Sequence, residues 1–145
     1  MKALLQRVLK AWVEHNGKEV ASIDQGLLIF LGVQKGDDEE KAKRLADQCS
    51  AIRIFEDRDG KMNHSLRDIN GQALVVSQFT LIANTKKGNR PSFTDAEGAQ
   101  KANHLYEKFI VQMSKNSIPT QKGIFGARMK VGLENDGPVT IMVEI

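Results

Sequence analysis

The sequence predicts an α+β fold, in which a curved, barrel-like and mostly antiparallel β-sheet is covered by two helices. Short apolar runs alternate with turn residues, two segments show helical spacing of apolar residues, and β-α-β alternation typical of a doubly wound nucleotide fold is not evident. A chain of 145 residues, 41% hydrophobic and 27% charged, is expected to form one domain, residues 1–145.

The first third of the chain is predicted to be a β-meander. Residues 3–13 alternate loosely with period two, and His15-Asn16-Gly17-Lys18 supplies a hairpin turn, because Asn and Gly both tolerate positive φ. Residues 19–24 would return as the second strand. Leu27 to Val33 is apolar on both faces, which indicates a central, buried strand.

Two helices are predicted from residue spacing. Asp37 or Asp38 can cap the first helix, and Thr94 or Asp95 the second. Apolar residues recur at intervals of three and four in both segments: Ala42, Leu45, Ala46, Cys49 and Ile52, then Ala102, Leu105, Tyr106, Phe109, Ile110 and Met113.

The remaining segments are predicted to be strands and turns. Ala73 to Leu81 is expected to be a second buried strand, after a turn around Asp59-Gly60. The last thirty residues suggest three more strands, with Glu134 to Pro138 separating the final two: Gln121 to Phe125, Met129 to Leu133 and Val139 to Ile145.

Composition excludes several classes of protein. Cys49 is the only cysteine, so an internal disulfide and a Cys-based zinc site are excluded, and a small buried core residue is the expected role. The histidines are isolated, so neither a metal nor another cofactor is expected. Without a signal-like or membrane-spanning apolar run, we expect a cytoplasmic protein. The net charge of +3 favours nucleic-acid binding only weakly.

Three polar segments are candidates for chemistry. Ser77-Gln78-Phe79-Thr80 ends an apolar strand, where free backbone N–H groups can bind an oxyanion, although composition alone favours side chains that merely bond neighbouring backbone at a sheet edge. Asp136-Gly137-Pro138 is either a plain turn or a held geometry, and the sequence does not assign the isomer before Pro138. Lys86, Lys87 and Arg90 form either a phosphate-binding loop or a solvated charge run.

Together these segments resemble the D-aminoacyl-tRNA deacylase family over nearly the whole chain. The matching motifs occur in the family's order: Ala3-Leu4-Leu5-Gln6-Arg7-Val8, Gly26-Leu27-Leu28 to Leu31-Gly32-Val33, Arg53-Ile54-Phe55, Gly60-Lys61-Met62-Asn63, Val76-Ser77-Gln78-Phe79-Thr80-Leu81, Arg90-Pro91-Ser92-Phe93 and Asn135-Asp136-Gly137-Pro138-Val139-Thr140. One departure is local, with Ile82 and Asn84 where Ala and Asp are typical.

The resemblance implies a homodimeric hydrolase that cleaves the ester between a D-amino acid and tRNA, and that also acts on mischarged glycyl-tRNA. Ser77 to Thr80 would line the pocket of one subunit, and Gly137-Pro138, in cis, would enter it from the other. Backbone atoms there would exclude L side chains, a form of chiral proofreading.

The resemblance also suggests roles for single residues. Arg7 would brace the Gly-Pro element, whereas in a monomer it would be an ordinary strand charge. Thr80 is the suggested position of a nucleophile, yet no adjacent base is evident. We therefore expect attack by water, an oxyanion held by backbone N–H groups near Phe79 and Thr80, and assistance from the ribose 2′-hydroxyl of the tRNA.

Two alternatives remain open. One is a sister deacylase with a trans Gly-Pro bond that removes L-alanine from tRNA, and the intact Arg7 and Gly137-Pro138 argue against it. The other is a non-catalytic RNA-binding dimer of the same fold, against which the retained Ser77 to Thr80 segment argues.

Overall fold

The computed structural model describes residues 1–86 and 88–145. Among these residues the elements follow one another as β1 (Lys2–His15), β2 (Lys18–Ile23), β3 (Gly26–Gly32), α1 (Glu39–Ala51), β4 (Phe55–Glu56), β5 (Met62–His64), β6 (Gln72–Ser77), the 3-10 helix η1 (Phe79–Ile82), α2 (Ala99–Lys115), β7 (Thr120–Lys122) and β8 (Lys130–Glu144). No helix in this described part is long and apolar enough to cross a membrane.

Strand β1 organises the main sheet, because it is long enough to pair with three other strands. One edge pairs antiparallel with β3 and then with β2, while β8 runs antiparallel along the other edge. Beyond β3 the sheet continues in parallel with β6 and β7. The predicted α+β architecture, a barrel-like and mostly antiparallel sheet with two covering helices, is confirmed.

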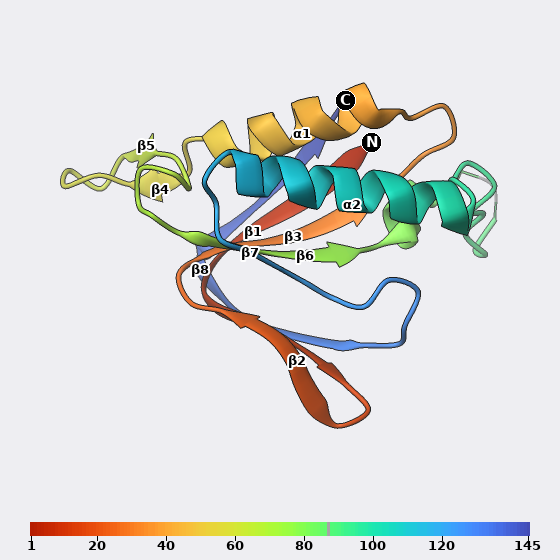
Figure 1. Ribbon diagram of the computed structural model, residues 1–145, viewed down its shortest axis with the longest axis horizontal. Coiled ribbons are helices and arrows are strands. Elements are labelled where there is room, and N and C mark those ends of the chain that lie inside the picture. The colour runs from red at the N-terminus through yellow and green to blue at the C-terminus, as the bar shows by residue number, and fades with distance from the viewer. Residues whose placement is uncertain (87) are drawn as a thin grey trace.

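The sheet separates two apolar cores. Helices α1 and α2 pack together on one face (Figure 1) and bury side chains such as Leu45, Phe109 and Leu5. On the other side β2 and part of β8 bend away from the helices, and the curved sheet encloses a smaller cluster that includes Val13, Ile23 and Leu74. This curvature leaves an opening at the end of β6, where the candidate site lies.

Several local predictions are confirmed. Asn16 and Gly17 adopt positive φ angles of 52° and 76° and connect β1 to β2. The Asp38 side chain caps α1 by accepting from the Lys41 N–H at 2.8 Å. Cys49 is fully buried in α1, and this burial raises the pKa of its thiol to about 12.

The predicted start of the second helix is wrong. Helix α2 begins at Ala99 after an N-cap at Gly98, which provides no side-chain cap. The preceding residues instead pair with the segment directly after β3, where Lys35 N–H donates to the Asp95 carbonyl and Glu97 N–H to the Val33 carbonyl. Tertiary hydrogen bonds to that segment therefore override the local capping signal.

The later strands also differ from the prediction. The strand expected to run to Leu81 ends at Ser77, because the chain then turns into η1. The final segment is a single strand, β8, rather than two strands joined by a turn. The connections from β3 to β6 and from β6 to β7 each pass through a helix and join parallel strands, so β-α-β units, which were not expected, are present.

Candidate active site

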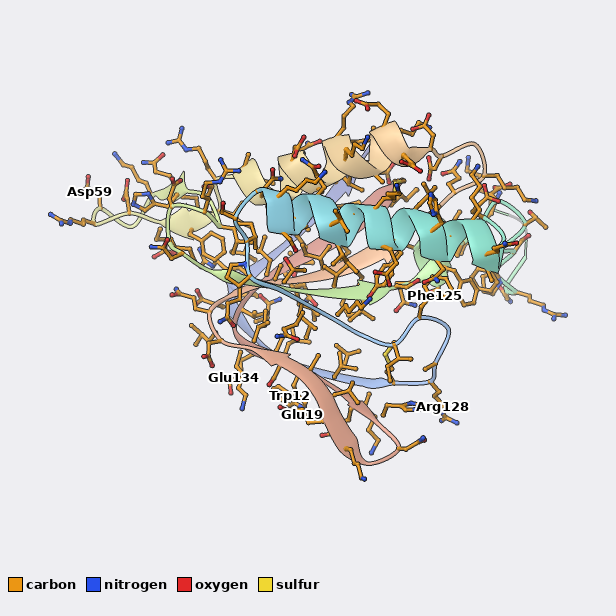
Figure 2. All side chains as sticks on the ribbon, viewed as in Figure 1. Trp12, Glu19, Asp59, Phe125, Arg128 and Glu134 are labelled. Carbon is orange, nitrogen blue, oxygen red and sulfur yellow. The ribbon has the colours of Figure 1, made fainter. Side chains whose placement is uncertain are left out.

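A pocket of about 360 Å³ lies where β6 ends. Figure 2 shows Phe125 at this end of the molecule, on the segment between β7 and β8. The walls come from the ends of β3 and β6, the first turns of α2 and the β7–β8 segment: Val33, Val76, Ser77, Gln78, Phe79, Glu97, Ala99, Ala102, Phe125, Gly126, Ala127, Met129 and Val131.

Ser77, Gln78 and Phe79 line one edge of this pocket, whereas Thr80, the last residue of the predicted segment, follows them and is not among the lining residues. Ser77 is the last residue of β6 and lies level with Leu31 of β3, whose carbonyl accepts from the Gln78 N–H at 2.9 Å. The chain then turns into η1, which leaves the Phe79 ring 57% exposed. Phe93 supports that ring edge-on, with 5.1 Å between the centroids.

The start of η1 presents two backbone donors. Among the described residues, neither the Phe79 N–H nor the Thr80 N–H has a hydrogen-bond acceptor, because both belong to the first turn of the helix. The Thr80 hydroxyl accepts a hydrogen bond from the Gln78 side-chain amide and forms no hydrogen bond with a His, Asp, Glu or Lys side chain in the described part of the chain. Two N–H groups without an acceptor, at a turn beside a pocket, are the kind of donor that can stabilise an oxyanion.

Glu97 supplies the one ionisable side chain among the described lining residues. Its carboxylate accepts from the Gly98 N–H at 2.9 Å and forms an ion pair with Lys101 at 3.0 Å. These contacts lower the pKa of Glu97, with the Gly98 hydrogen bond contributing most. At neutral pH the carboxylate is therefore charged and a weak base.

Gly137 and Pro138 lie on an exposed bulge of β8. Gln6 pairs with Thr140 and Val8 with Asn135, so four residues of β8 stand opposite Arg7. The peptide bond between Gly137 and Pro138 is cis. Asn135 closes the base of the bulge, since its side chain accepts from the Val139 N–H and donates to the Thr140 hydroxyl.

Arg7 holds this bulge from inside the protein and is only 4% exposed. Its Nε donates to the Asp136 carbonyl at 3.1 Å and lies 3.1 Å from the Asp136 carboxylate. Its Nη1 donates to the Ile54 carbonyl at 2.8 Å, and its Nη2 lies 3.3 Å from Glu56 Oε1. The buried Arg7 side chain thus connects the bulge of β8 to the β4–β5 hairpin through hydrogen bonds and ion pairs.

The bulge and the pocket are separated within one chain. Val131, which lines the pocket, pairs with Val13 of β1, whereas the bulge stands opposite Arg7, six residues away along the same strand. At about 3.3 Å per residue, the bulge lies up to about 20 Å along β1 from that wall of the pocket. Gly137 is accordingly not among the residues that line the pocket of its own chain.

The predicted basic loop follows η1. Lys86 and Arg90 are exposed, and Asn84 and Ser92 close the base of the loop through two backbone hydrogen bonds of 2.8 and 2.9 Å. Lys87 lies outside the described residues. The polar cleft beside Ile82 and Lys86 is separate from the pocket at the end of β6.

Sequence reasoning missed most of the pocket wall. Ala99, Phe125 and Met129 line the pocket but carry no polar group, so nothing in the sequence distinguishes them from core residues. Glu97 was overlooked because it was expected to lie inside the first turns of α2. The nearness of Phe125 to Tyr106, with 5.8 Å between centroids, depends on tertiary packing.

Among the described residues, the pocket combines neighbouring N–H groups that lack an acceptor with no strong base, an arrangement suited to stabilising the oxyanion of an ester hydrolysis. The chain belongs to the D-Tyr-tRNA(Tyr) deacylase family, whose model matches residues 4–144. Members of this family are hydrolases, and this protein is an enzyme of that class.

Individual relatives agree with this assignment. A D-aminoacyl-tRNA deacylase of Aquifex aeolicus is 53% identical over 99% of this chain and 97% of its own length. That of Lactobacillus acidophilus is 48% identical over the full length of both chains. Among solved structures, the c-Myc DNA unwinding element binding protein superposes with a TM-score of 0.94 at 36% identity, covering 100% of this chain and 99% of that one.

A further solved structure, described as a probable eukaryotic D-amino acid tRNA deacylase, has a TM-score of 0.83. Its identity is 18%, and it covers 99% of this chain and 98% of its own. That similarity concerns the fold alone.

Proposed function

We propose that the protein hydrolyses the ester bond of D-aminoacyl-tRNA and releases free D-amino acid and tRNA. The observation that carries this proposal is the pocket at the end of β6, beside which the N–H groups of Phe79 and Thr80 remain without an acceptor among the described residues. Membership of the deacylase family supports the choice of substrate.

In the proposed reaction, water attacks the ester carbonyl and the N–H groups of Phe79 and Thr80 stabilise the resulting oxyanion. The bond between the acyl carbon and the ribose oxygen then breaks, the acyl group keeps the hydroxyl from water, and the ribose oxygen takes up a proton. The 2′-hydroxyl of the terminal ribose assists this proton transfer, since the described pocket offers only the weakly basic Glu97. Gln78 orients Thr80, which positions the substrate and does not attack it.

The second part of the proposed site comes from a partner subunit. Gly137 and Pro138 are exposed but lie far from the pocket of their own chain, and a second copy of the molecule is the simplest way to bring them to it. Their backbone carbonyls would then contact the substrate's α-amino group and occupy the space of an L side chain. Glycine has no side chain, so mischarged glycyl-tRNA would also be accepted.

The remaining parts of the proposal concern recognition and location. Arg7 positions Gly137 from within the fold through its bonds to Asp136. Lys86, Lys87 and Arg90 are proposed to contact tRNA phosphates near Phe79, and the homodimer is proposed to act in the cytoplasm, where aminoacyl-tRNA is found.

Deacylation of matched D-tyrosyl-tRNA and L-tyrosyl-tRNA tests this proposal. Release of tyrosine from the D form alone is the expected result, while the L form should be lost no faster than in buffer. Preference for an L-aminoacyl-tRNA would indicate the sister deacylase. Binding of tRNA without any hydrolysis would indicate a non-catalytic RNA-binding protein.

A further inference from the structure

We propose that Tyr106 is a positioning residue of the site, because its side chain joins three of the walls of the pocket at the end of β6. This role rests on the proposed deacylase function, and it gives the reaction a residue that is not among the described residues lining the pocket. Tyr106 lies in the middle of α2 and is only 1% exposed. It therefore acts through its neighbours and does not touch the substrate.

The first of these walls is α2 itself. Ala99, Ala102 and Tyr106 follow one another at spacings of three and four residues, so their side chains share one face of the helix. Ala99 and Ala102 line the pocket, and Tyr106 continues the same face into the apolar core. The packing of Tyr106 thus determines how closely this face of α2 approaches the sheet.

The second wall is the end of β6, which the Tyr106 hydroxyl holds directly. The hydroxyl donates to the Val75 carbonyl at 2.8 Å inside the core. The next two residues of the strand, Val76 and Ser77, line the pocket and lead into the turn that presents the Phe79 N–H. The hydrogen bond therefore fixes β6 two residues before the strand ends.

The third wall is the segment between β7 and β8, and it meets the same carbonyl. Gly123 directly follows β7, and its N–H donates to the Val75 carbonyl at 3.0 Å, so that oxygen accepts two hydrogen bonds. Two residues further on, the Phe125 ring lines the pocket and lies 5.8 Å from the Tyr106 ring, between centroids. The hydroxyl and the ring of one tyrosine thus hold two walls against the helix that carries it.

The Tyr106 hydroxyl serves as a neutral donor. Burial raises the pKa of Tyr106 above its ordinary value, so the hydroxyl keeps its proton at neutral and mildly alkaline pH. Its removal would leave the Val75 carbonyl with the Gly123 N–H as a partner, so no buried acceptor would become unpaired. The fold should therefore survive the loss of this hydrogen bond, while the walls of the pocket become less precisely placed.

The variant Tyr106→Phe removes only the hydroxyl and tests this role. We expect kcat for D-tyrosyl-tRNA to fall about tenfold while KM stays within about twofold, because misplaced oxyanion donors impair the transition state more than they impair binding. The factor should be the same at neutral and mildly alkaline pH, because the hydroxyl does not titrate in that range. A kcat that stays at its original value would overturn the proposal.

Ser50→Ala is the matched control, because it also removes a buried hydroxyl that donates to a backbone carbonyl. Ser50 is 1% exposed, donates to the Ala46 carbonyl at 2.8 Å and is not among the described residues that line the pocket. Both variants should unfold about 2 to 6 °C lower than the unmodified protein, yet only Tyr106→Phe should lower kcat. An equal loss of kcat in both variants would show a general loss of stability and refute positioning by Tyr106.

A measurement without substrate separates this role from the proposed function. In NMR spectra of the free protein, the backbone amide resonances of Gly123 and Phe79 should shift in Tyr106→Phe and stay in place in Ser50→Ala. The Gly123 resonance reports the lost hydrogen bond, and the Phe79 resonance reports the turn that carries the oxyanion donors. A Phe79 resonance that stays in place in Tyr106→Phe would refute the proposal, whereas an unmodified enzyme inactive on D-tyrosyl-tRNA would refute the deacylase function itself.

Discussion

Thr80 tests the proposed mechanism at the scale of one residue. Its hydroxyl bonds to the Gln78 amide and has no base beside it among the described residues, so it is not activated for attack. Thr80→Ala is expected to keep kcat/KM within about tenfold, whereas loss of a true nucleophile in a hydrolase costs up to roughly a millionfold. Single-turnover deacylation of D-tyrosyl-tRNA measures the difference. Complete inactivity of a folded variant would require a covalent mechanism through this hydroxyl.

Gly137 is expected to tolerate no side chain. It has a φ of +120°, and an added Cβ would lie 2.8 Å from Val139 Cγ2 and 3.0 Å from Arg7 Nη2. Gly137→Ala should therefore displace the bulge and lower kcat/KM at least about a hundredfold, as a shift of about 1 Å can do. Gly98→Ala is the matched control, because nothing lies within 4 Å of its added Cβ. Steady-state deacylation at equal rates in both variants would contradict this role.

The sequence revealed polar site residues more readily than apolar ones. Ser77 to Thr80 stood out because hydroxyl and amide groups at the end of an apolar strand require partners. Phe125 and Met129 did not, since an apolar side chain carries no sign of whether it faces a core or a pocket. Arg7 became meaningful only through the family resemblance, because its partners are carbonyls distant in sequence.

At the scale of elements, the β4–β5 turn depends on one carboxylate. Asp57 accepts two backbone N–H groups, so Asp57→Ala should speed amide exchange at Asp59 and Lys61. Asp59→Ala is the control, because no hydrogen bond to its carboxylate occurs among the described residues. Hydrogen exchange followed by NMR should show faster exchange in the first variant only, and equal protection in both would exclude Asp57 as the residue that orders the turn.

Because the charged Asp57 carboxylate holds the turn, the order of the β4–β5 turn should depend on pH. The folded pKa of Asp57 lies below its ordinary value, so its contribution is present above about 3.9, the pKa of an unfolded Asp, and is lost as pH falls through the folded value. Protection of the Lys61 amide in the unmodified protein should therefore decline below that range. The Asp57→Ala variant should show no such decline.

Element types were predicted better than element boundaries. The Asn16-Gly17 hairpin and the Asp38 cap depend on local chemistry and are confirmed. The predictions for the start of α2 and for two separate final strands were wrong, because hydrogen bonds to distant segments determine both. The Asp95 carbonyl accepts from the Lys35 N–H, and β8 continues past its bulge because β1 offers pairing partners before and after that bulge.

At the scale of the whole molecule, the proposed site requires two subunits and so predicts complementation. Ala99→Trp should inactivate a dimer by filling both pockets, and Gly137→Ala by displacing both bulges. A mixed dimer joins the open pocket of the Gly137→Ala subunit to the intact bulge of the Ala99→Trp subunit, which restores one site of two. With random mixing, about half of the dimers are mixed, so the population should regain about a quarter of the original specific activity.

Co-expression of the two variants with different affinity tags, followed by deacylation assays of each purified species, measures this recovery. Two inactive variants that stay inactive in a verified mixed dimer would show that pocket and bulge act within one chain, and the distance of up to about 20 Å along β1 between them would then have to close by rearrangement.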